Sequence, residues 1–237
     1  MRAVAVIALL SLCTVHARAQ SSVHDFRLGG AARVLNEECI RLTPDAQYLS
    51  GSAWFKEPID LDAPFEMRLS VVLGKKDVLG ADGIVFVFHT APRTGFRGEA
   101  MGVGGLVPSF GIELDTYQNL HRGDPEVDHL GWLIDGDASH GRDREAASFV
   151  ELHNLEDGAR HPLRITWDPE GEGSLEVALD GKRVATYPGR SVRSVFGGER
   201  RVYWGMTAGT GRLSNEQDVC IERLLLSRVD LKARQGA

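Results

Sequence analysis

Apolar and polar residues alternate along several short stretches of this chain, which is the pattern of half-buried β-strands. Residues 84–88, with the sequence IVFVF, differ because they are apolar throughout, so they predict a strand buried inside the molecule. The predicted strands cover residues 65–73, 84–88, 112–117, 163–167, 175–179, 184–188, 202–207 and 219–226.

The connections between these strands indicate the fold class. Asp180-Gly181 predicts a two-residue hairpin turn, because glycine accepts the positive φ that such turns need. No segment shows the helical period, and no repeat or low-complexity linker divides the chain. Strands joined by turns without helices between them indicate an antiparallel sandwich of two sheets. Such a sandwich commonly has about 200–250 residues, so the 237 residues predict one domain.

The N-terminus has the pattern of a signal peptide. Arg2 supplies a positive start, residues 3–12 are apolar, and Ala17-Arg18-Ala19 offers a small-x-small cleavage site. The apolar run is shorter than the about twenty residues of a membrane span. We therefore expect residues 1–19 to be removed and the mature protein to be secreted or periplasmic, with no membrane span. Residues 229–237 predict a polar C-terminal tail.

The charge of the chain argues against a nucleic-acid partner. Its formal net charge is −6 at pH 7, and no basic run interrupts the sequence. Removal of the signal peptide would make the mature chain still more acidic, because that segment carries arginines and no acids.

Side chains able to bind a cation gather in the segment GIELDTYQNLHRGDPEVDHLGW. Glu113 and Asp115 are two residues apart on a predicted strand and so share one face. A loop that folds back can add Asn119, Asp124 and His129. Oxygen ligands suit calcium, and an added imidazole suits a transition ion such as manganese. The alternative from these residues alone is a solvated acidic loop, although three close acids would repel one another without a cation.

The spacing of these residues resembles the metal-binding segment of the legume-type (L-type) lectins. Glu-x-Asp-Thr-Tyr-x-Asn is followed by Asp124-Pro125 and then by His129-Leu130-Gly131, each at an interval of five residues. The strings ADGIVF (81–86) and YWGMTAGTG (203–211) are similar to two further strands of that family. The resemblance implies a concanavalin-like all-β sandwich, the legume lectin jelly roll, over residues 20–228.

The resemblance also implies two adjacent metal sites. A transition-metal site, usually Mn²⁺, would use Glu113, Asp115, Asp124 and His129. A Ca²⁺ site would use Asp115, Asp124, the side-chain oxygen of Asn119 and the backbone carbonyl of Tyr117. Ser139 lies where the family often has a serine that reaches manganese through water.

The same resemblance implies that glycans are the partners and that the metals do not catalyse a reaction. The metals would hold a loop and a cis Ala81–Asp82 peptide, which would present the Asp82 carboxylate to two sugar hydroxyls. Asn119 would donate through its amide, and a backbone N–H of Gly104, or alternatively of Gly105 or Gly102, would reach a third hydroxyl. The Tyr117 ring would pack on the sugar. Backbone N–H groups of Arg212 and Leu213 would reach further oxygens, as in mannose/glucose binders.

Two remaining residue types carry separate predictions. Cys39 and Cys220 lie in the first and last strand-like segments, and an exported compartment permits a disulfide. Because the terminal strands pair in L-type lectins, the resemblance favours this bridge over two buried thiols.

Five other histidines have no ligand-like spacing and are predicted to lie on the surface: His89, His121, His140, His153 and His161.

Three functions compete at this point. The first is a non-enzymatic lectin, and the family often forms homodimers through a flat sheet. The second is a glycoside hydrolase on a similar sandwich, which would need a second glutamate four or five residues after Glu113; Tyr117 and Gln118 stand there instead. The third is an adhesion or structural module without a sugar site. The sequence favours the lectin.

Overall fold

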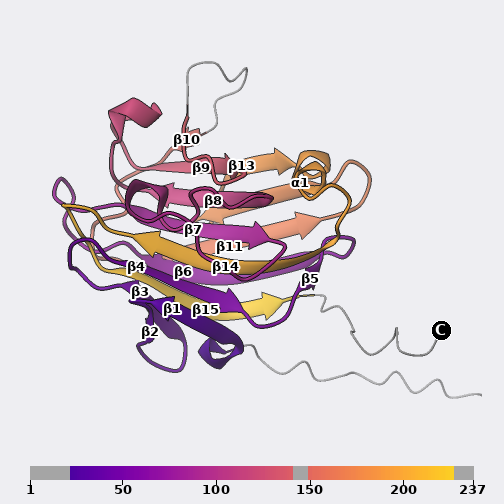
Figure 1. Ribbon diagram of the computed structural model, residues 1–237, viewed down its shortest axis with the longest axis horizontal. Helices are drawn as coiled ribbons and strands as arrows, with labels where there is room; N and C mark the ends of the chain where they lie inside the picture. The colour runs from indigo at the N-terminus through magenta and orange to yellow at the C-terminus, as the bar shows by residue number, and fades with distance from the viewer. Residues whose placement is uncertain (1–21, 141–148, 227–237) are drawn as a thin grey trace, which may run out of the picture.

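The computed structural model describes residues 22–140 and 149–226, which form a sandwich of two antiparallel sheets. Figure 1 shows the strands of the first sheet one beneath another, with those of the second overlapping them. The first sheet has the order β1 (Phe26–Gly30), β4 (Ser50–Phe55), β14 (Arg201–Gly209), β7 (Gly83–His89), β8 (Ser109–Asp115), β9 (His129–Ile134) and β10 (Phe149–Glu151), with β5 (Ile59–Asp60) on β14. The second has the order β13 (Lys182–Pro188), β12 (Ser174–Leu179), β11 (His161–Asp168), β6 (Phe65–Val72), β15 (Gln217–Leu225), β3 (Cys39–Thr43) and β2 (Arg33–Val34).

The strands predicted from alternation are confirmed, with shifts of a few residues at their ends. The Asp180-Gly181 hairpin turn is confirmed as well, since both residues have positive φ, 50° and 77°. The all-β prediction of an antiparallel sandwich is therefore correct. The predicted signal peptide (1–19) and the predicted tail (229–237) lie outside the described residues.

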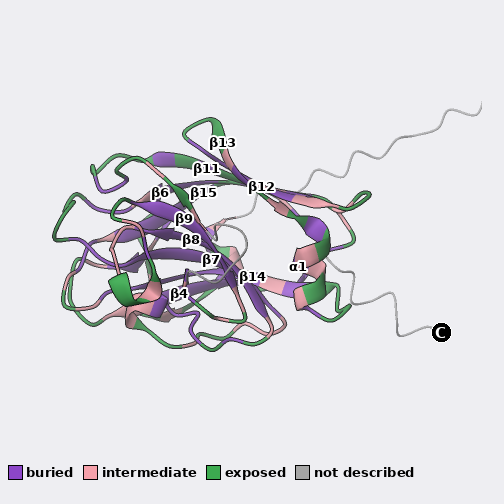
Figure 2. Cartoon of the chain, turned by 90° about the horizontal axis from the view of Figure 1, so that it is seen from above, coloured by how far each residue is buried: buried purple, intermediate pink, exposed green. Residues whose placement is uncertain are grey.

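Helical segments among the described residues are short and lie in connections. They are η1 (Val23–Asp25), η2 (Gly98–Ala100), η3 (Leu120–Arg122) and α1 (Gly189–Val195). The sequence pattern did not predict α1, because seven residues are too few to establish a helical period. Figure 2 places α1 at one end of the sandwich, where it packs on β12, β13 and β8. No helix within the described ranges is long and apolar enough to cross a membrane.

Two apolar clusters explain why the central strands are buried on both faces (Figure 2). Ile84, Phe86 and Phe88 of β7 point into the main core between the sheets. Val85 and Val87 point to the other face and join a second cluster. The other members of this second cluster are Trp54, Met101, Val103, Leu106, Leu133 and Ala138. A loop over residues 98–106 thus covers the outer face of the first sheet. Because β7 is covered on both faces, side chains on both of its faces are apolar.

The predicted Cys39–Cys220 disulfide is confirmed and joins β3 to β15. The two cysteines are directly paired across these antiparallel strands. The bridge links segments 181 residues apart in the sequence. The strands near the two ends of the domain are therefore held together covalently.

Candidate functional site

The candidate metal-binding side chains meet where β8 and β9 pair in the first sheet. Asp115 lies opposite His129, and Glu113 lies opposite Gly131. The side chains of Glu113, Asp115 and His129 are all buried. A Cβ on residue 131 would stand only 2.0 Å from Glu113 Oε1, so glycine is required beside this carboxylate. The strand pairing therefore gathers three of the predicted ligands.

The loop after β8 brings Asp124 back to these residues. Its turn is made by η3 and by Gly123, which has a φ of 87°. The N–H of Asn119 donates to Asp124 Oδ2 at 2.7 Å, and the N–H of Tyr117 donates to Asp115 Oδ1 at 2.8 Å. Each acid thus has one oxygen fixed by a backbone donor, and its second oxygen is left for another partner.

His140 belongs to this cluster, so the prediction that it lies on the surface was wrong. Its Nε2 is 2.5 Å from Glu113 Oε1 and 3.2 Å from His129 Nε2. Its backbone N–H donates to the carbonyl of Arg122 at 2.7 Å, which ties the two loops together. His140 directly follows Ser139, for which the resemblance implied a water-mediated contact with manganese. This position was the available sequence signal that His140 lies close to the cluster.

Two other histidines assigned to the surface are also buried. His89 follows the apolar run of β7, and its Nδ1 meets the backbone N–H of Ala91 at 2.8 Å. His161 begins the alternation that continues through Leu163, Ile165 and Trp167, so it lies on their inward face. For His161 the phase of the alternation was a usable signal, because residues i and i+2 of a strand share a face; for His89 the signal was its position at the end of a continuous apolar run.

Burial and mutual repulsion shape the charges of the cluster. Burial raises the pKa of Glu113, and burial together with the neighbouring Glu113 carboxylate raises the pKa of Asp115 well above its usual range. Burial also raises the pKa of Asp124. Burial and the nearby His140 lower the pKa of His129 to about 4, so this imidazole is neutral at physiological pH. A neutral imidazole has a free lone pair, which is the form that binds metals.

The residues of this cluster fit a cation. Asn119 Oδ1 and Asp124 Oδ1 are buried and have no hydrogen-bond donor among the described residues. Such oxygens are costly to leave without a partner, and a cation satisfies them. Nitrogen and oxygen atoms of Glu113, His129 and His140 all lie within 4.8 Å of one another. The donor set combines carboxylates, an amide oxygen and two imidazoles, which suits calcium beside a transition ion.

Asp82 lies next to this cluster, at the start of β7. The Ala81–Asp82 peptide is cis, as the resemblance implied. The N–H of Thr116 donates to the Asp82 carbonyl at 2.9 Å, which joins Asp82 to the metal-binding loop. Burial raises the pKa of Asp82 to about 6, and the charge of Glu99 contributes to this rise. Its Oδ2 is buried without a hydrogen-bond donor among the described residues.

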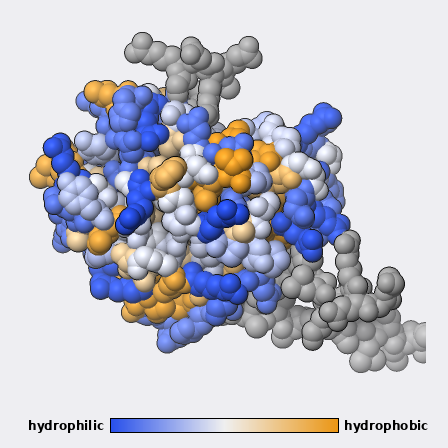
Figure 3. Space-filling view, viewed as in Figure 1, coloured by the Kyte–Doolittle hydropathy of each residue, from blue (hydrophilic) through white to orange (hydrophobic). Residues whose placement is uncertain are grey.

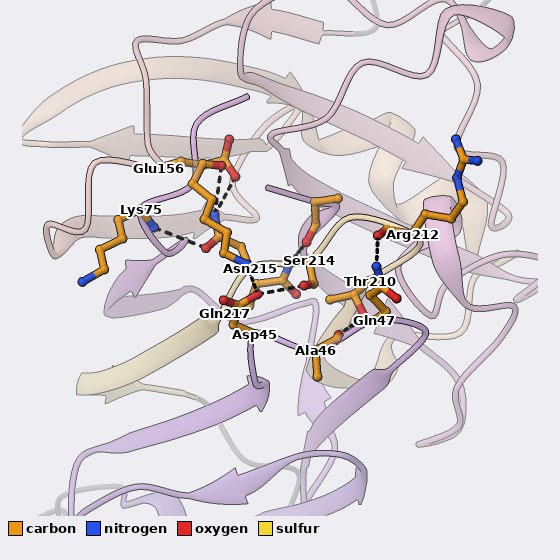
Figure 4. A network of polar contacts seen from close by, with 12 residues as sticks. Asp45, Ala46, Gln47, Lys75, Glu156, Thr210, Arg212, Ser214, Asn215 and Gln217 are labelled. Carbon is orange, nitrogen blue, oxygen red and sulfur yellow. Dashed lines mark hydrogen bonds and ion pairs between the residues drawn. The ribbon is translucent and has the colours of Figure 1, made fainter. Parts of the chain in front are cut away.

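The loop that carries Arg212 and Leu213 follows β14 and faces Asp82. A Cβ on Gly211 would lie 4.0 Å from both carboxylate oxygens of Asp82. Gln47 Nε2 donates to the Arg212 carbonyl, and the Thr210 hydroxyl donates to the Ala46 carbonyl at 2.8 Å (Figure 4). The structure therefore brings this loop beside Asp82 and anchors it to residues 46–47.

Gln217, Asn215 and Glu156 belong to a polar network (Figure 4), and this network also holds Ala81, the residue before Asp82. Gln217 Nε2 donates to the carbonyls of Ala81 and Gly209, at 3.0 and 3.2 Å. The N–H of Asn215 donates to the same Ala81 carbonyl at 3.1 Å, and its Nδ2 donates to Glu156 Oε1 at 2.7 Å. The backbone on both sides of Asp82 is thus fixed by buried hydrogen bonds.

The glycine run lies on the loop over residues 98–106. The N–H of Gly105 already donates to Gly136, and that of Gly102 donates to Phe96. Gly104 pairs with Phe96 in an isolated antiparallel bridge, in which its carbonyl accepts from the N–H of Phe96 at 2.8 Å. A Cβ on Gly104 would stand 2.9 Å from the Cβ atoms of Phe96 and Ala100, so the site requires glycine.

Several large apolar side chains are exposed in connecting loops, and two of them, Tyr48 and Leu120, adjoin the candidate site. The face in Figure 3 is largely hydrophilic, with apolar side chains in small groups. All the large apolar side chains that are 62–82% exposed lie in connecting loops; they are Tyr48, Val78, Leu79, Phe96, Val107 and Leu120. The N–H of Tyr48 donates to the Gly211 carbonyl, and Leu120 follows Asn119 directly. Tyr48 and Leu120 therefore provide apolar surface beside the polar groups.

The fold and the arrangement of these residues agree with a known protein family. The family profile described as the legume lectin β-barrel domain matches residues 17–223. The chain belongs to this legume lectin family. Membership of this family indicates a carbohydrate-binding protein.

Solved structures of lectins and of the VIP36 domain share the fold. The basic winged bean lectin with Tn-antigen has a TM-score of 0.66 at 21% identity, over 85% of this chain and 92% of that chain. The Bauhinia forficata lectin in complex with GalNAc has a TM-score of 0.70 at 18% identity, over 84% and 91%. The exoplasmic/lumenal domain of VIP36, bound to Ca²⁺ and Man3GlcNAc, has a TM-score of 0.62 at 20% identity, over 87% and 85%.

A curated relative shares a shorter stretch of sequence. The serine-rich adhesin for platelets of Staphylococcus aureus (strain MRSA252) is 39% identical over 88 residues. This stretch covers 35% of the present chain and 6% of the adhesin. The chain therefore matches only a small part of the length of this relative.

Proposed function

We propose that this legume lectin is an exported glycan-binding protein that depends on two bound cations and catalyses no reaction. Residues 1–19 would be its signal peptide, and residues 20–228 its lectin domain. The Cys39–Cys220 disulfide supports an oxidising location outside the cytosol. The observation that carries the proposal is the buried Asp82 Oδ2, which lacks a donor beside a cluster fitted for cations.

The transition ion would be held by Glu113, Asp115, Asp124 and His129, together with His140. Mn²⁺ is the first candidate, and Ca²⁺ would take the adjacent site through Asp115, Asp124, Asn119 Oδ1 and the Tyr117 carbonyl. The raised pKa values of the three acids support this assignment, because burial raises all three and neighbouring carboxylates add to the rise at Glu113 and Asp115. Bound cations supply positive charge, which keeps these acids ionised and fixes the loop that carries Asn119.

The position of Glu113 supports a role as a metal ligand rather than as a catalytic residue of a glycosidase. A glycosidase needs a pair of carboxyl groups that face the substrate. Glu113 is 1% exposed and lies against His140 and His129. A carboxylate in this position is available to a cation and is shielded from a sugar.

Asp82 would accept hydrogen bonds from two neighbouring sugar hydroxyls. Asn119 Nδ2 would donate to the sugar while its Oδ1 holds calcium, and the N–H of Gly104 would reach a further oxygen. The Tyr117 ring would pack on the apolar face of the sugar, and the N–H groups of Arg212 and Leu213 would close the other side. Mannose- or glucose-type glycans are the proposed ligands.

A glycan array of the protein loaded with Ca²⁺ and Mn²⁺ tests this function. Asp82→Asn should lose binding to every glycan that the wild type retains, because an amide donates where the sugar hydroxyl also needs to donate. Asp62→Asn, on an exposed acid paired with Arg200, is the control and should bind like the wild type. Metal content and the melting temperature establish that Asp82→Asn is folded. An Asp82→Asn array identical to that of the wild type contradicts the site.

A second candidate function is adhesion through protein contacts without a sugar site. The short match to a platelet adhesin favours it. A folded, metal-loaded wild type that binds no glycan on the array supports this candidate over the first.

A further inference from the structure

A second cluster of metal-ligating side chains lies apart from the candidate lectin site. His161 begins β11, Asp180 occupies the β12–β13 turn, and His153 lies in the connection after β10. Two of these positions are in the second sheet or its hairpin, whereas Glu113 and His129 lie in the first sheet. We propose that His153, His161 and Asp180 bind a transition ion of the zinc class.

The three side chains converge on one point. Asp180 Oδ2 lies 3.0 Å from His153 Nε2 and 2.9 Å from His161 Nδ1. Ligand atoms from all three residues lie within 4.8 Å of one another. Ligands about 2.0–2.2 Å from a tetrahedral zinc ion are separated by slightly more than 3 Å. A small outward movement of His153 therefore admits an ion.

His161 carries a second observation that points to a metal. Its Nδ1 faces Asp180, while its Nε2 lies 3.2 Å from Asp157 Oδ1. A neutral imidazole has one N–H, so it satisfies one of these two carboxylates. A metal ion at Nδ1 leaves the proton on Nε2 to donate to Asp157. A metal-bound histidine regularly donates its other N–H to a carboxylate in this way.

The scaffold holds two ligands in place and leaves the third free to close. The His161 side chain is 6% exposed, and the N–H of Asp180 donates to the Pro162 carbonyl at 2.9 Å. Asp157 is fixed in turn by the N–H of Ala159 at 2.7 Å. The His153 side chain is 58% exposed on a loop. A bound ion would therefore tie this loop to the β12–β13 turn.

The chemistry of the donors selects the ion. Two imidazoles and one carboxylate suit Zn²⁺, Ni²⁺ or Cu²⁺, whereas Ca²⁺ prefers six or more oxygen ligands. Three protein ligands also leave a fourth tetrahedral position open to water or to an incoming group. This site differs from the acid-rich site at Glu113 in both donors and location.

Zinc titration of the full chain tests the proposal, after Ca²⁺ and Mn²⁺ have been loaded and the excess removed. His153→Gln should bind one Zn²⁺ fewer than the wild type, or bind it at least tenfold more weakly. Asp180→Asn should behave alike, and asparagine tolerates the positive φ of this turn. Asp157→Asn should weaken binding by about tenfold. Zn²⁺ should raise the melting temperature of the wild type but not of His153→Gln.

The matched control is His24→Gln. His24 is an exposed histidine 3.8 Å from the Glu37 carboxylate and is not part of a metal-ligating group among the described residues. It should bind as many Zn²⁺ ions as the wild type. Equal zinc stoichiometry and affinity in the wild type and in folded His153→Gln would overturn the proposal and leave the three residues as an ion-pair cluster. Because no glycan is involved, this result is independent of the lectin function.

Discussion

His140 Nε2 lies 2.5 Å from Glu113 Oε1, and both side chains are 1% exposed. His129 Nε2 is 3.2 Å from the same His140 nitrogen. Two imidazoles and a carboxylate therefore converge inside the protein. The spacing of residues 113–129 had predicted only one of these imidazoles, that of His129. The proposed transition-metal site accordingly has a candidate ligand beyond the four that the resemblance implied.

Replacement of His140 should weaken transition-metal binding selectively. In His140→Gln we expect Mn²⁺ or Co²⁺ to bind at least tenfold more weakly, because an imidazole donor is lost, while Ca²⁺ affinity is retained. Calorimetric titration of metal-free protein with each ion measures both quantities. His121→Gln, an exposed histidine paired with Glu99, is the control. Unchanged Mn²⁺ and Co²⁺ affinities in His140→Gln would show that His140 only packs against Glu113.

The hydrogen bonds of Gln217 predict a link between stability and glycan binding. Gln217→Glu removes the Nε2 donor from the carbonyls of Ala81 and Gly209 and places acceptors against acceptors. The buried carboxylate would face two carbonyl oxygens without a hydrogen to donate, so the free energy of unfolding should fall by about 1–3 kcal/mol, although the carbonyls of Ala81 and Gly209 keep the N–H donors of Asn215 and Asp82. It should also weaken glycan binding, since the Ala81 carbonyl precedes Asp82. Denaturant unfolding and glycan titration measure the two effects.

Gln47→Glu is the comparison at the exposed end of the same network, where the amide donates to Arg212. It should change stability little, because water can solvate the groups that lose the bond. Similar unfolding free energies for Gln217→Glu and the wild type would contradict the role assigned to Gln217.

Glu156 predicts a pH dependence of stability. Burial raises its pKa from 4.5 to about 8, and the charge of Asp128 contributes to the rise. Between these two values the folded protein holds a proton that the unfolded chain has released. The free energy of unfolding therefore falls as the pH rises through this window. Glu156→Gln keeps an acceptor oxygen for Asn215 and removes this titration.

The melting temperature measures this effect. Relative to the wild type, Glu156→Gln should gain stability steadily from about pH 5 to about pH 8. Glu172→Gln changes a glutamate that is 81% exposed, so its difference from the wild type should not vary with pH. A pH-independent difference for Glu156→Gln would mean that Glu156 is ionised in the folded protein.

Local sequence patterns predicted most of the fold. Alternation located β6 and β11, the continuous apolar run located β7, and Asp180-Gly181 located a hairpin turn. These features can be predicted from the sequence because each depends on residues that are neighbours in the chain. The short helix α1 was missed because its seven residues are stabilised by packing on β12 and β13 rather than by a periodic pattern.

The part of the candidate site that was predicted consists of residues close together in the sequence. Glu113, Asp115 and His129 meet because β8 and β9 pair directly, and Asp124 returns through a short loop. His140 reaches Glu113 through a later loop that is fastened to Arg122, and no spacing rule describes that contact. The network of Asn215 and Gln217 likewise joins segments far apart in the sequence and became visible only in three dimensions.

The central claim is that bound cations hold the glycan-binding loops of this lectin in place. The most direct measurement is a glycan array with one preparation in three states: loaded with Ca²⁺ and Mn²⁺, exhaustively chelated, and reloaded. We predict binding in the first state, loss of binding together with a lower melting temperature in the second, and recovery in the third. Chelated protein with no measurable metal that still binds the same glycans with the same strength would contradict the claim.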